Sequence, residues 1–152
     1  MSSPADRPES VVSSPPETAR ARHRSRPLAA LLALLVGWAG LHRLYLRSGL
    51  WWIQPMIAMP AIGWALRTEP WFRQPGFFVF TVVVVLSLIE AIVISLTSDE
   101  RWDQRHNPAS GQRSANRWAP VIIAVLSLIG AAMLGMTVMA IALEGYFMAR
   151  RG

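Results

Sequence analysis

Three ionisable side chains interrupt apolar stretches of this 152-residue chain, and they are its best candidates for chemistry. His42 and Arg43 follow Gly40 near the end of one apolar run, and Tyr45 comes two residues later. A histidine beside an arginine can bind a lipid headgroup or another anion, and it can equally anchor a helix end by reaching toward the phosphates. The motif contains no nucleophile and no second metal ligand, so it does not predict catalysis.

The third side chain, Glu90, lies inside a longer apolar run. A charge within the bilayer costs roughly 3 kcal/mol on insertion scales, so such a carboxylate is usually paired, protonated or exposed to a cavity. It could relay protons or ions, or it could form a structural pair with an Arg or His of another helix. We expect the pair, with His42 or Arg43 as partner, because consecutive antiparallel spans would bring these residues into the same half of the membrane.

Neither of two further groups of side chains predicts a metal site. The methionines between 133 and 139 lack the additional donors that copper would need. The acidic residues between 99 and 103 alternate with arginines, which is typical of a solvated helix end with local ion pairs rather than of a calcium loop. Because the chain contains no cysteine, disulfides and thiol chemistry are excluded. We therefore expect no cofactor, no metal and no enzymatic activity.

Four apolar segments must position these side chains, at 28–46, 50–66, 76–97 and 119–143. A helix needs about 20 apolar residues to cross a bilayer, and the last two segments satisfy this outright. The first does so if His42 and Arg43 lie near its end, whereas the second is short and carries Pro55 and Pro60. Most tryptophans, among them Trp102, lie at or just beyond segment ends, as expected for rings at headgroup level. The sequence predicts an all-α integral membrane protein with three or four spans and short loops.

The apolar segments are flanked by polar regions rich in arginine. Residues 1–27 are expected to form a disordered cytoplasmic tail that binds anionic headgroups through Arg20, Arg22, Arg24 and Arg26. Residues 109–118 are predicted to form a polar loop, and 119–152 an additional transmembrane helix with a short basic C-terminus. All 15 basic residues are arginines placed between apolar runs, which favours a bacterial inner-membrane protein over a nucleic-acid binder.

Orientation depends on the number of spans. With four, both termini are cytoplasmic and the 98–118 loop lies outside, although it carries four arginines. With three, that loop lies inside and the C-terminus outside. The positive-inside rule does not choose between them, because each arrangement places some arginines on the disfavoured side.

The residues from Gly37 to Leu46 resemble the linker of the TM-two domain family, membrane proteins named for a pair of transmembrane helices. That linker usually reads Gly-x-His-Arg-Phe-Tyr-Leu-Gly, and Leu44 and Arg47 depart from it here. The resemblance covers 28–108: the 49–54 stretch is similar to the start of the family's next helix, and Glu90 to its later acidic position. It implies a membrane domain found in varied contexts, without a settled activity.

Two hypotheses for function follow. The first is association of helices, as a scaffold, assembly or regulatory partner, in a homo-oligomer or with another membrane protein. It draws on small residues at four-residue intervals in two apolar segments, which let helices approach closely in lipid. These residues are Ala29, Ala33 and Gly37, and Ser127, Ala131 and Gly135. The alternative is an ion- or proton-conducting or transport subunit that uses Glu90.

Overall fold

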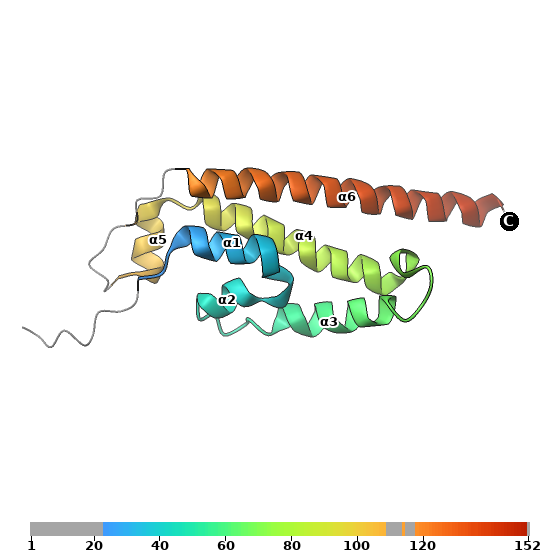
Figure 1. Ribbon diagram of the computed structural model, residues 1–152, viewed down its shortest axis with the longest axis horizontal. Helices are drawn as coiled ribbons and strands as arrows, with labels where there is room; N and C mark the ends of the chain where they lie inside the picture. The colour runs from blue at the N-terminus through green and yellow to red at the C-terminus, as the bar shows by residue number, and fades with distance from the viewer. Residues whose placement is uncertain (1–22, 109–113, 115–117, 152) are drawn as a thin grey trace, which may run out of the picture.

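The computed structural model describes residues 23–108, 114 and 118–151, and within them the regular structure is entirely helical. The elements are α1 (Arg26–Val36), η2 (Gly37–Ala39), α2 (Leu41–Tyr45), α3 (Ile53–Ala65), η3 (Trp71–Arg73), α4 (Pro75–Leu96), α5 (Asp99–His106) and α6 (Ala119–Arg151). Figure 1 shows α1, α3, α4 and α6 lying along one long axis, with the short α5 across one end. We refer to this as the α5 end.

Two of the described helices, α4 and α6, are long and apolar enough to cross a membrane. Helix α4 begins with Pro75, which suits the first helical position because its missing N–H would have no partner there. At a rise of 1.5 Å per residue, the 22 residues of α4 span about 33 Å and the 33 residues of α6 about 50 Å. Helix α6 therefore projects beyond the other helices at the end opposite α5 (Figure 1).

The predicted 28–46 segment is not one helix, because the chain reverses direction at Gly40. This glycine has φ = 70°, a left-handed conformation that L side chains rarely adopt, and its N–H donates to the Gly37 carbonyl at 2.8 Å. Helix α2 then runs back along α1 (Figure 1), so that the Tyr45 hydroxyl accepts a hydrogen bond from the Ser25 N–H at 3.0 Å. The first predicted span is therefore a short helix, α1, after which the chain reverses direction into α2.

Helices α1 and α3 run in the same direction and pack one after the other along α4. At the α5 end, Arg26 of α1 donates to the Thr97 carbonyl, and farther along Gly37 packs against Ser87 of α4. Helix α3 continues from this level toward Gly76, the second residue of α4, which lies against the Ala61 carbonyl. The two short helices together cover the length of α4, with α2 and the 46–52 turn inserted between them.

Small side chains form the interfaces between these helices. Ala29, Ala33, Ala58, Ala65 and Ala91 are fully buried. A Cβ on Gly76 would lie 2.3 Å from the Ala61 carbonyl oxygen, so the backbones of α3 and α4 approach too closely for any side chain at this point. The stripe of small residues in the first apolar segment therefore packs within the chain.

The hairpin order expected for four spans is consequently wrong. The second segment does form a helix, α3, despite Pro55 and Pro60, but it continues in the direction of α1 rather than returning. Because the chain turns back through α2 before it continues into α3, α1 and α3 together pass along the length of α4 only once. Along the axis of α4 the described chain makes three traverses, by α1 with α3, by α4 and by α6.

Candidate functional site

Glu90 of α4 is the centre of a polar cluster that joins three helices. Its carboxylate accepts a hydrogen bond from Nε2 of His42 and is paired with the Arg43 guanidinium, whose Nε lies 3.4 Å from Oε2. Gln54, the second residue of α3, donates from Nε2 to the same Oε2 at 3.3 Å. The predicted pairing of Glu90 with His42 or Arg43 is confirmed, and both residues take part.

Gly40 brings these side chains together. By reversing the chain, it turns the first residues of α2 toward α4, where His42 becomes almost fully buried and Arg43 remains 30% exposed. The other ring nitrogen of His42, Nδ1, is buried and has no hydrogen-bond partner among the described residues. The cluster therefore places the Glu90 carboxylate against the Arg43 guanidinium and the His42 ring.

One member of this cluster, Gln54, was not identified from the sequence. Gln54 reaches both Glu90 and the Ser87 hydroxyl, which lies 3.4 Å from its Nε2, and Ser87 in turn donates to the Val83 carbonyl at 2.9 Å. In the sequence, Gln54 is only a polar residue next to Pro55 in a short apolar segment. The sequence feature that could have identified Gln54 is its isolated amide in an apolar helix, because a buried amide needs hydrogen-bond partners in the interior.

No protein-family model, curated protein or solved structure matches this chain. The resemblance to the TM-two family therefore stays a prediction, and the site is interpreted from its own geometry.

A second polar site lies at the α5 end, where Trp102 of α5 and Asn107 bond to the backbone of Arg24, just before the start of α1. The Arg24 carbonyl accepts hydrogen bonds from the Trp102 indole at 2.9 Å and from the Asn107 amide at 3.0 Å, and the Arg24 N–H donates to Asn107 Oδ1 at 2.8 Å. Trp102 is only 2% exposed and stacks on His106. The Trp102 ring is therefore buried within the protein rather than facing lipid, and its position at headgroup level stays a prediction.

The arginines assigned to the tail divide into two groups. Arg20 and Arg22 lie outside the described residues. Arg24 and Arg26 belong to the helical unit: Arg24 donates from a terminal guanidinium nitrogen to the Leu46 carbonyl at 3.1 Å, and Arg26 is buried and pairs with Asp99 at 3.0 Å. These two residues fix the start of α1 rather than extending freely toward lipid.

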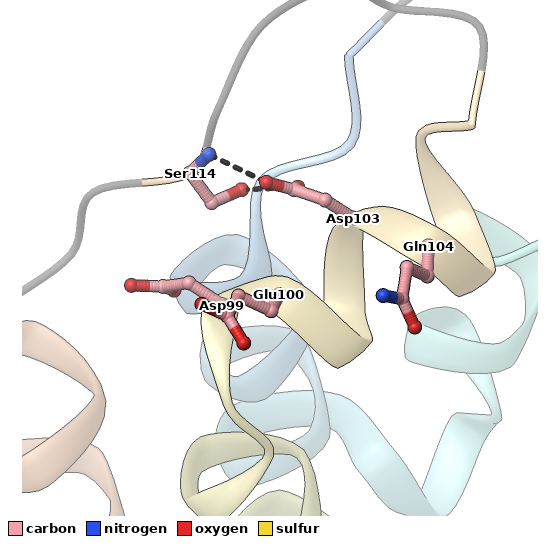
Figure 2. A pocket seen from close by; sticks show the side chains of 5 residues that line it. All are labelled: Asp99, Glu100, Asp103, Gln104 and Ser114. Atoms are coloured by element: carbon pink, nitrogen blue, oxygen red, sulfur yellow. Dashed lines mark hydrogen bonds between the residues drawn. The ribbon is translucent and has the colours of Figure 1, made fainter.

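The acidic side chains of α5 line a cavity of about 550 Å³ together with Gln104 and Ser114. Figure 2 shows the Asp103 carboxylate turned toward Ser114, whose N–H and hydroxyl both donate to it at 2.7 Å, while Asp99 and Glu100 point elsewhere. Because the carboxylates do not converge, no group of three His, Cys, Asp or Glu in the described chain is placed to hold a metal ion.

Two groups on α5 have shifted pKa values. Burial lowers the pKa of His106, and the charges of Arg105 and Arg24 add to that effect. Burial by itself would raise the pKa of Asp103, but the hydrogen bonds from Ser114 and Asn107 outweigh it and hold that pKa below its usual value. Because both pKa values are lowered in the folded chain, protonation of either group at acidic pH destabilises the contact of α5 with Arg24, which is therefore more stable at neutral than at acidic pH.

Proposed function

We propose that this chain is an integral membrane protein with three crossings that acts by associating with other membrane helices through α6. Helices α1, α3, α4 and α6 turn large apolar side chains outward. In α6, only 17% of the most apolar stretch is buried, and Met133, Met136 and Met139 are each more than 60% exposed. An apolar surface of this extent is unfavourable in water and is covered by lipid or by a partner.

The charge distribution orients the three proposed crossings. If α1 with α3, α4 and α6 each cross once, the segments 1–27 and 98–118 share one side, and 66–74 and 144–152 share the other. The first pair of segments carries nine arginines and the second pair four. The positive-inside rule then places the N-terminus and the α5 end in the cytoplasm, and the C-terminus outside.

A single-cysteine experiment tests these crossings, since the chain has no cysteine of its own. Cysteines at Ser3 and Ser114 should resist an impermeant thiol reagent in intact cells and react after lysis. Cysteines at Thr68 and Ala149, at the opposite end, should react in intact cells. If Ala149 is protected like Ser3, the chain makes an even number of crossings and the topology proposed here fails.

The observation that carries the association is the unused space beside Gly135. A Cβ at Gly37 would collide with Ser87, so that glycine is needed for packing within the chain, but a Cβ at Gly135 would meet nothing within 4 Å. A glycine inside a helix costs about 1 kcal/mol relative to alanine. On an exposed apolar face next to Ala131 and Ala132, it offers a close approach to another helix.

Substitution of Gly135 should abolish association and leave the fold unchanged. We expect the wild-type chain in mild detergent to have a mass by light scattering that exceeds its 16.9 kDa, as a second copy or a co-purified partner, and Gly135→Leu to reduce it to the monomer. Gly63→Leu is the matched control, because a Cβ there also meets nothing within 4 Å. A wild-type chain that stays monomeric in lipid nanodiscs and retains no partner would contradict the proposal.

The Glu90 cluster supports this function over the alternative of ion or proton conduction. Glu90 is 29% exposed, but its carboxylate already accepts hydrogen bonds from His42, Arg43 and Gln54, which a conducting carboxylate would have to break to exchange a proton or ion with water. Its charge is already balanced by Arg43. Voltage-driven proton flux in liposomes that Glu90→Gln abolishes would favour the alternative.

A further inference from the structure

A groove opens beside the Glu90 cluster, between α4 on one side and α2 with the turn after it on the other. Its volume is about 280 Å³. The α4 wall is apolar, formed by Ile89, Val93 and Ile94, while the opposite wall ends in Ser48. Ile89 and Val93 are 46% and 61% exposed, so the groove lies open along the side of the helix bundle rather than enclosed within it.

The polar side of the groove retains donor capacity. Arg43 uses Nε and one terminal nitrogen on Glu90, and its other terminal nitrogen makes no hydrogen bond within the described chain. The Ser48 N–H donates to the Arg43 carbonyl at 2.9 Å, and both residues line the groove. A guanidinium and a hydroxyl that line one groove form a donor set that suits a phosphate group.

The charge around the groove is positive. Arg24 donates to the carbonyl of Leu46, a residue that lines the groove, and the exposed Arg47 follows directly. Arg43 lies in the groove and the Arg24 guanidinium reaches its wall, against the single carboxylate of Glu90. The groove thus combines an excess of positive charge with an apolar wall.

We propose that this groove binds one anionic glycerophospholipid, with its phosphate on Arg43 and Ser48 and an acyl chain along Ile89 and Val93. The proposal rests on the membrane location proposed above, and it assigns a lipid to a defined place. Glu90 lies six residues before Leu96, so the phosphate site is about 9 Å inside the end of α4. A lipid there would be drawn deeper than its neighbours, and its exchange would be correspondingly slow.

Native mass spectrometry of the purified full chain in mild detergent tests the site. We expect one phosphatidylglycerol per chain to bind at least tenfold more tightly than phosphatidylcholine. Val93→Trp, which fills the groove, and Ser48→Asp, which places a negative charge beside Arg43, should each weaken phosphatidylglycerol binding about tenfold or more, equivalent to about 1.4 kcal/mol. Val125→Trp is the matched control, because Val125 is a 50% exposed valine of α6 that does not line the groove.

The outcomes distinguish a specific lipid-binding site from nonspecific lipid binding. Equal losses in Val93→Trp and Val125→Trp, or no preference for the anionic lipid, would overturn the proposal. Displacement of phosphatidylglycerol by inorganic phosphate would assign the donors to a free anion instead. Ser48→Asp guards against a folding artefact, since Ser48 lies outside the helices and its side chain makes no hydrogen bond in the described chain. If lipid selectivity is absent while cysteine labelling still shows three crossings, the lipid-site proposal fails and the proposed membrane topology stands.

Discussion

Glu90→Gln is expected to lower the free energy of unfolding by about 2 to 3 kcal/mol. The substitution keeps the shape of the side chain but leaves the Arg43 guanidinium without its counter-charge in a largely buried position. Breaking a fully buried pair costs about 3 to 5 kcal/mol, and the lower value applies here because these side chains are still 29% and 30% exposed. Chemical unfolding in detergent, followed by far-UV circular dichroism, measures the difference.

The chain provides a matched control for this substitution. Glu144 pairs with Arg73 at 2.8 Å, but these side chains are 47% and 39% exposed, so Glu144→Gln should cost less than about 1 kcal/mol. Removing the stranded charge in the double variant Glu90→Gln, Arg43→Gln should restore at least half of the loss at position 90. A Glu90→Gln variant as stable as Glu144→Gln would show that the carboxyl does not carry the charge that balances Arg43.

Gly40→Ala is expected to cost more than about 3 kcal/mol and to abolish the native arrangement of α2. The left-handed conformation at φ = 70° costs a non-glycine residue roughly 1 to 2 kcal/mol. In addition, the new Cβ would lie 2.3 Å from the Trp51 carbonyl oxygen, a backbone atom that cannot move without displacing the start of α3. The same unfolding experiment measures the loss.

Gly49→Ala is the control for this prediction, because it changes the same residue type in the turn between α2 and α3. A Cβ at Gly49 meets nothing within 4 Å, and the expected change in stability is within about 0.5 kcal/mol. Equal stability of the Gly40→Ala and Gly49→Ala variants would mean that the chain does not reverse at Gly40.

Hydropathy predicted the long helices because their apolar runs are uninterrupted. The 76–97 segment corresponds to α4, Pro75–Leu96, and the 119–143 segment lies within α6. The apolar run was ended at Glu144 because of its charge, although Tyr146, Phe147 and Met148 beyond it are apolar and α6 continues to Arg151. Hydropathy records where the chain is apolar and carries no information on its direction, so the reversal at Gly40 was not predicted.

The pairing of Glu90 could be predicted because an isolated charge in an apolar helix is unfavourable in any arrangement of helices. The hairpin order from which we derived it does not occur, and the pair forms because α2 folds back to the level of Glu90. The role of α5 could not be predicted, since the contact of Trp102 and Asn107 with the Arg24 backbone depends on tertiary structure alone. A main-chain partner leaves no pattern in side-chain types.

One traverse is divided between α1 and α3, and this division has a consequence for the insertion of the nascent chain in the proposed topology. Helix α1 has 11 residues and α3 has 13, each well short of the roughly 20 that the insertion machinery requires for a stable transmembrane segment. In the proposed membrane topology, neither helix would be released into lipid alone as the nascent chain emerges, and Arg43 would have no counter-charge until Glu90 has been synthesised. Residues 26–96 would then leave the translocation channel as a single hairpin, with α4 as the template on which the two halves of the proposed first crossing assemble.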